Sequence, residues 1–88
     1  MLFRSYEVSN WNGVYISNDF PIGTEIELIS KSVTGFKINV DPQMIIYPLP
    51  KTTGVGLQTY EYGNRITLFK RTSTEWITSN IVGQFETL

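Results

Sequence analysis

The sequence predicts an all-β fold: a small antiparallel β-sandwich or jelly-roll-like barrel of seven to eight short strands. Three observations support this class. Short runs of alternating apolar and polar residues recur at roughly ten-residue spacing. Turn signals of Gly, Pro and Asn separate these runs, and no longer segment shows sustained helical periodicity. We expect one domain that comprises residues 1–88.

Length and composition limit the core and the compartment. A chain of 88 residues buries only about two-thirds of its unfolded surface, so the core is expected to be thin. The hydrophobic content of 41% and the aromatic content of 14% are typical of a globular chain. No apolar run approaches the length of about 18 residues that a membrane span needs, and no signal peptide is expected.

The residue types also restrict the chemistry. Seven basic and eight acidic residues give a net charge of -1, which argues against nucleic-acid binding. Cysteine and histidine are both absent, which removes the usual zinc ligands and the commonest general base. We therefore predict no catalytic residue, no cofactor and no transition metal. The carboxylates of Asp19 and Asp41 stay open as ligands for a hard cation.

The first predicted hairpin spans residues 3–17, where Asn12-Gly13 separates two β-prone runs. An Asn-Gly pair favours the type I′ turn, whose twist matches that of paired strands. Trp11 beside this turn has two interpretations: an exposed aromatic that stacks on a sugar ring, or a lid over one end of the core. We favour the lid, because a small domain seldom leaves a tryptophan uncovered.

The second predicted hairpin follows the connection through Pro21 and Gly23. In the strand at residues 24–30, apolar Ile26 and Leu28 alternate with glutamates, which indicates one buried and one solvated face. The two glutamates, at positions 25 and 27, have the spacing of solvated charge on a strand, and we do not assign them to catalysis. The strand at residues 35–40 repeats the alternation, with Phe36, Ile38 and Val40 inward.

The middle of the chain contains a short apolar run, Met44-Ile45-Ile46-Tyr47, which Pro48 and Pro50 end. Proline cannot donate to a sheet ladder, so this run is predicted to be an edge or a crossing connection. Residues 51–56 are predicted to be a linker. Their Gly-Val-Gly lacks the strand, helix and lysine of a phosphate-binding loop.

Residues 57–79 are predicted to form three antiparallel strands joined by two tight turns. Gly63-Asn64 makes the first turn, because glycine supplies the positive φ of a type II′ turn. Residues 71–74 make the second turn, and the tail at residues 81–88 has enough apolar residues to add a further strand or to dock on a neighbouring subunit. Together, the alternations predict seven core residues: Ile26, Leu28, Phe36, Ile38, Ile66, Leu68 and Trp76.

Two tryptophans, five tyrosines and five phenylalanines are difficult to hide in so thin a core. Those outside the alternating core positions are therefore candidates for burial against another subunit, which would also protect the edge strands. The candidates for this interface are Tyr47, Tyr60, Tyr62, Phe69 and Phe85.

Several short motifs follow one another in an informative order. They are Phe20-Pro21-Ile22-Gly23-Thr24-Glu25-Ile26, a hairpin centred on Gly35, Met44-Ile45-Ile46 before a Pro/Gly-rich loop, Tyr62 to Leu68, Lys70, and Glu75-Trp76-Ile77. This order resembles a small β domain of tailed-phage virion structural proteins and covers about residues 14–83. The glycine that follows the tryptophan strand in that family is displaced here to Gly83.

The resemblance implies a non-enzymatic component of a bacteriophage virion, such as a capsid-attached accessory or decoration protein or a tail-fibre module. Its implied partners are further copies of itself, most often as a homotrimer, and other virion proteins. The alternative is a module that binds host-surface carbohydrate. In that case Trp11, Tyr47, Tyr60, Tyr62 or Trp76 would stack on pyranose rings.

Overall fold

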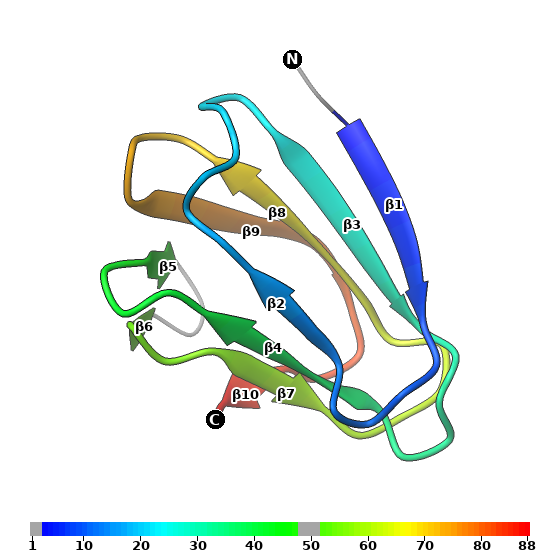
Figure 1. The fold of residues 1–88 in the computed structure, drawn as a ribbon. Coiled ribbons are helices and arrows are strands. Elements are labelled where there is room, and N and C mark those ends of the chain that lie inside the picture. The colour runs from blue at the N-terminus through cyan, green and yellow to red at the C-terminus, as the bar shows by residue number, and fades with distance from the viewer. Residues whose placement is uncertain (1–2, 48–51) are drawn as a thin grey trace.

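The computed structural model describes residues 3–47 and 52–88, which form two β-sheets packed face to face (Figure 1). The six-stranded sheet has the order β1 (Phe3–Val8), β3 (Glu25–Ser30), β8 (Arg65–Lys70), β9 (Glu75–Val82), β5 (Ile45–Tyr47) and β6 (Thr52–Thr53). The four-stranded sheet has the order β10 (Glu86–Thr87), β7 (Leu57–Thr59), β4 (Phe36–Val40) and β2 (Val14–Ile16). The described residues include no helix long and apolar enough to cross a membrane. The predicted all-β sandwich is confirmed.

The core lies between the two sheets, where the alternation along each strand directs every second side chain. All seven predicted core residues have an exposed fraction of 0%, which confirms the assignment of faces. The same layer contains five further buried apolar residues: Val8, Ile16, Met44, Ile46 and Leu57. Both glutamates of β3 lie on the opposite, outer face of the sheet, as expected.

Four connections, which we call arches, carry the chain from one sheet to the other at the same end of the sandwich (Figure 1, lower right). They are residues 9–13, 31–35, 60–64 and 83–85, which join β1 to β2, β3 to β4, β7 to β8 and β9 to β10. Wherever two arches are neighbours, the strands that they connect are also neighbours, one pair in each sheet. The arches are therefore stacked in a row.

These arches correct three predicted hairpins. The turns at Asn12-Gly13, at residues 31–35 and at Gly63-Asn64 do not pair the strands that flank them, because each pair is divided between the two sheets. A glycine with positive φ fits the turn of an arch as well as that of a hairpin, so the turn residue does not distinguish them. The arch is formed because it lets the two flanking strands face each other and bury their apolar sides. The antiparallel β8–β9 hairpin is confirmed.

Other details of the prediction also change. The described residues contain ten strands instead of seven or eight. Three pairs run parallel, namely β1 with β3, β2 with β4, and β5 with β9. The first two follow from the arches, because stacked arches of the same direction place equivalent strands side by side. β5 lies between β9 and β6, so it is not an edge, and the expected linker contains β6. Pro48, Pro50 and Lys51 lie outside the described residues, whereas the predicted C-terminal strand is confirmed as β10.

Glycine is required where an arch contacts the backbone of a strand next to it, which is β4 for Gly13 and the end of β7 for Gly35. Gly13 and Gly35 have φ values of 78° and 84°. A Cβ at Gly13 would lie 1.8 Å from the carbonyl oxygen of Lys37, and one at Gly35 would lie 1.9 Å from that of Thr59. Both distances are far below van der Waals contact, so any side chain would force the arch away from that strand.

Buried hydrogen bonds connect the third arch to its neighbours. The side chain of Asn64 donates from Nδ2 to Thr59 Oγ1 over 2.6 Å, and Thr59 Oγ1 donates to the carbonyl oxygen of Gln84 over 2.7 Å. The backbones of Ser30 and Asn64 add a bond of 2.8 Å. Since no buried side-chain polar atom of the described residues is without a partner, this polar end is compatible with a dry core.

Lys70 and Asn18 connect the strands at the other end of the sandwich. Lys70 is 3% exposed, and its ammonium group donates to the carbonyl oxygen of Asn18. The Asn18 side chain accepts a bond of 3.1 Å from Trp76 Nε1, and its backbone N–H donates to Asp41 Oδ2 over 2.7 Å. The connection from β2 to β3 is thereby held against β8 and β9.

Leu68→Ala should lower the free energy of unfolding by roughly 2 to 5 kcal/mol, because it leaves a cavity among fully buried side chains. Urea denaturation measures the loss. Val33→Ala is the control, since Val33 is 83% exposed and should change stability by less than about 0.5 kcal/mol. A loss below about 1 kcal/mol for Leu68→Ala would place this residue outside the core.

Gly35→Ala should destabilise the fold far more than Gly63→Ala, although both glycines have a similar positive φ (84° and 87°). A Cβ at Gly63 meets nothing within 4 Å, so that variant isolates the backbone strain of about 1 to 2 kcal/mol. Gly35→Ala adds a collision with the next arch. If urea denaturation showed the same loss of unfolding free energy for both variants, the close contact at Gly35 would not contribute to stability.

Candidate functional site

Two arches bring Trp11 and Tyr60 together on the surface, and we call these residues the aromatic pair. Their ring centroids are 5.8 Å apart at an interplanar angle of 26°. Together with Thr34 of the arch between them, they line an open hollow of about 380 Å³. Trp11 is half-buried and Tyr60 is 49% exposed, so both rings remain accessible.

A polar row lies beside the aromatic pair on the outer face of the four-stranded sheet. The register places Lys37 opposite Gln58, and Gln58 opposite Glu86. Glu86 Oε1 accepts a hydrogen bond of 2.9 Å from the Tyr60 hydroxyl and one of 3.3 Å from Gln58 Nε2. Lys37 Nζ lies 5.2 Å from the centroid of the Trp11 ring. The rings and the polar groups thus form one continuous surface.

Glu86 changes the acidity of Tyr60. The hydrogen bond to this carboxylate raises the pKa of the Tyr60 phenol above its usual value of 10.0, with smaller contributions from desolvation and from the negative charge of Glu86. The neutral phenol donates to the carboxylate, whereas the phenolate would be repelled by it. At neutral pH Tyr60 is therefore a protonated hydrogen-bond donor directed at Glu86.

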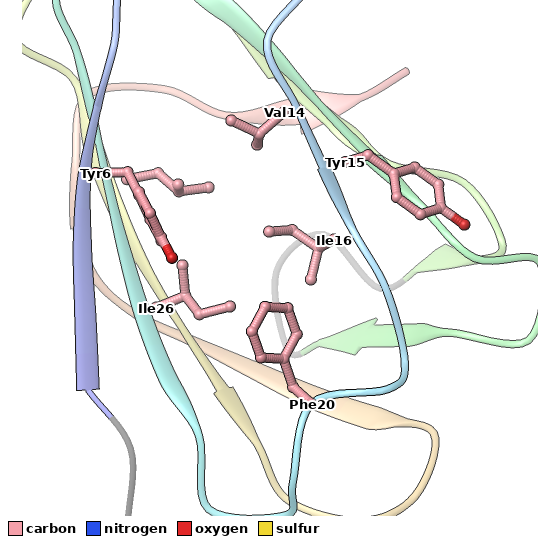
Figure 2. Close-up of a pocket in the computed structure, with 7 residues that line it drawn as sticks. Tyr6, Val14, Tyr15, Ile16, Phe20 and Ile26 are labelled. Atoms are coloured by element: carbon pink, nitrogen blue, oxygen red, sulfur yellow. The ribbon is translucent and has the colours of Figure 1, made fainter.

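An apolar cavity of about 300 Å³ opens between the two sheets along the edge formed by β1 and β2. Figure 2 shows Tyr6, Ile16, Phe20 and Ile26 pointing into it, while Tyr15 points away. The arches end at this edge, so no further arch covers the core there. The volume is at the lower limit for small-molecule pockets.

A row of apolar side chains crosses the outer face of the six-stranded sheet. The register aligns Phe3 with Glu25, Glu25 with Phe69, Phe69 with Ile77, and Ile77 with Tyr47. Paired residues project to the same face, and the flanking residues on β3, β8 and β9 point into the core, so these five point outward. We call Phe3, Phe69, Ile77 and Tyr47 the apolar row.

One of the hollows among the described residues is lined by a carboxylate. Glu27 lines a polar hollow of about 380 Å³ beside Arg65 and Asn80, and the lining residues include no second carboxylate. A glycosidase needs two carboxylates that face one cleft. Residues 3–47 and 52–88 also contain no group of three or more metal-ligating side chains, and Asp41 instead accepts the Asn18 amide.

The predicted interface residues lie in four separate places. Tyr47 and Phe69 share the apolar row, whereas Tyr60 belongs to the aromatic pair. Tyr62 is 59% exposed, with Lys31 Nζ at 5.4 Å from its ring centroid. Phe85 packs against the core, edge to face with Phe36 at 6.1 Å. The predicted set is therefore not one continuous surface.

Sequence patterns alone did not identify six residues of these surfaces: Phe3, Thr34, Lys37, Gln58, Ile77 and Glu86. Lys37 and Gln58 alternate with core residues, so their position on an outer face could be predicted. Their proximity depends on the pairing of β4 with β7 and of β7 with β10, which joins segments distant in sequence. The proximity of these residues follows from the strand register, which no local sequence pattern predicts.

Comparison with protein families, with curated proteins and with solved structures found no match. The function is therefore argued from these surfaces.

Glu86→Gln should lower the pKa of Tyr60 towards about 10, because it replaces the carboxylate that favours the neutral phenol. The folded pKa is raised, so the stabilisation from this contact is complete below pH 10 and disappears as the pH rises through the folded pKa. Tyrosinate absorbance during a pH titration measures the shift. Tyr60→Phe identifies the titration step that belongs to this residue, and an unchanged step in Glu86→Gln would contradict the assignment.

Proposed function

We propose that this chain is a non-enzymatic structural component of a bacteriophage virion, a capsid-attached accessory or tail-fibre module that assembles through protein–protein contacts. The apolar row on the six-stranded sheet is the observation that supports this proposal most. Phe3 is 58% exposed, and the row continues across β8, β9 and β5. Glu25 of β3 separates Phe3 from Phe69, and the apolar side chains are contiguous from Phe69 through Ile77 to Tyr47. Apolar side chains gathered on a sheet face are typical of a surface covered by another protein.

The open edge of the same sheet supports assembly in a second way. β1 contains six residues and has no neighbour on its outer side in the described chain. It contains no proline, and β6 at the opposite edge has only two residues. Long free edges pair readily with other chains unless they are covered. Phe3 lies on β1, so a subunit seated on the apolar row would also reach this edge.

The cavity beside β1 adds a third feature of the same kind. It is lined by apolar side chains from both sheets and lies next to the free strand. A neighbouring subunit that pairs with β1 could insert an apolar side chain there, as in other cases of strand addition. Self-association, as a homotrimer, and attachment to a larger virion protein both use these features.

Phe69→Asp should convert the oligomer to a monomer of 10.1 kDa, because a carboxylate at the centre of the apolar row cannot be buried without a partner. Light scattering on dilute protein measures the mass, and the unmodified chain should show a trimer. Val33→Asp is the control, since Val33 is 83% exposed on the second arch, away from the apolar row and the cavity, and should leave the oligomer intact.

A wild-type monomer that stays soluble at high concentration would contradict self-assembly. Detection of the chain by mass spectrometry in purified phage particles tests the virion location separately.

A further inference from the structure

The aromatic pair and the polar row offer two kinds of contact in one place. The rings of Trp11 and Tyr60 stack on each other and line an apolar hollow, while Lys37, Gln58 and Glu86 present donors and an acceptor next to them. A ligand that fits both needs a flat apolar face and hydroxyl groups around its rim. Pyranose rings have this shape, since their axial C–H groups form an apolar face and their hydroxyls point sideways.

We propose that the outer face of the four-stranded sheet binds an uncharged saccharide, with one pyranose ring stacked on the aromatic pair in the hollow above Thr34. Glu86 accepts a hydrogen bond from a ring hydroxyl, and the Gln58 amide and the Lys37 ammonium group donate to others. The hollow of about 380 Å³ is large enough for one hexose unit.

The groups of this site are held in place before a ligand arrives. The Trp11 carbonyl oxygen accepts the backbone N–H of Lys37 over 3.2 Å, and Gly13 N–H donates to the Asn10 carbonyl oxygen over 2.8 Å. The Tyr60 hydroxyl is bonded to Glu86 over 2.9 Å. Such ordering reduces the entropy that binding costs.

The charge of this surface favours a saccharide over nucleic acid, which aromatic surfaces also bind. Nucleic-acid sites combine stacking with a positive field, but this surface pairs one lysine with one glutamate, and the whole chain has a net charge of -1. Proline-rich peptides also dock on aromatic grooves, yet they offer few hydroxyls for the polar row. The polar row therefore favours the saccharide.

The site does not depend on the assembly proposed above. The aromatic pair and the polar row belong to the arches and to the four-stranded sheet, whereas the apolar row lies on the outer face of the other sheet. Phe69→Asp should therefore leave saccharide binding by each subunit unchanged. A failure of one proposal is distinguishable from a failure of the other.

The test has two steps. A glycan array that carries neutral and sialylated oligosaccharides first identifies a ligand, and a proline-rich peptide is included as the competing class. Tryptophan fluorescence then measures the affinity for the best neutral oligosaccharide. Trp76 is fully buried, so a change in emission reports on Trp11. Binding of a neutral oligosaccharide with this change is the expected result.

Trp11→Ala should weaken binding about tenfold or more, as read by the array and by calorimetry, because the stacking surface is lost. Glu86→Gln should weaken it severalfold. Tyr62→Ala is the matched control, since Tyr62 is an exposed tyrosine of the same arch as Tyr60 but outside the hollow, and it should bind normally. Urea denaturation verifies that each variant is folded. If Trp11→Ala does not fold, the affinity of Glu86→Gln alone tests the proposal. This variant should fold, because the Glu86 side chain is exposed.

Three results would overturn the proposal: no binding to any neutral oligosaccharide on the array, equal binding by the wild type and by folded Trp11→Ala or Glu86→Gln, or binding of the proline-rich peptide instead.

Discussion

The first two arches lie directly against backbone atoms of the next chain segment, Gly13 against β4 and Gly35 against the end of β7. At Gly13 and Gly35, a single added methyl group would overlap a carbonyl oxygen of the next chain segment. This close stacking sets the spacing of the strands that enter and leave the arches, and it explains why β1 pairs parallel with β3 and β2 with β4. The buried Asn64 network holds the third arch in the same row.

The stacked arches also determine which surface residues become neighbours. Trp11 and Tyr60 belong to the first and third arches, and they meet on the surface above Thr34 of the second arch. At the β1 and β2 end, the row of arches stops and leaves an apolar cavity and a free strand edge (Figure 2). One packing constraint therefore accounts for a polar and aromatic face and for an open apolar edge.

The two outer faces differ in chemistry, which suits a module with two kinds of contact. The six-stranded sheet presents apolar side chains that are suited to burial against protein. The four-stranded sheet presents hydrogen-bonding groups fixed beside two rings, which are suited to a soluble, hydroxyl-rich ligand. A module seated on a particle through the first face would leave the second exposed to the surroundings.

The sequence by itself determined the strand class and the inward residues, because alternation of period two is a local property that shows in any single strand. Ile26, Leu28, Ile38 and Leu68 could therefore be placed in the core without knowledge of any partner strand. The turn residues did not determine whether a glycine turn makes a hairpin or an arch, since both need the same positive φ. Only the tertiary structure decided that point, and with it the parallel pairs, the aromatic pair and the apolar row, because each depends on the packing of segments that are distant in the chain.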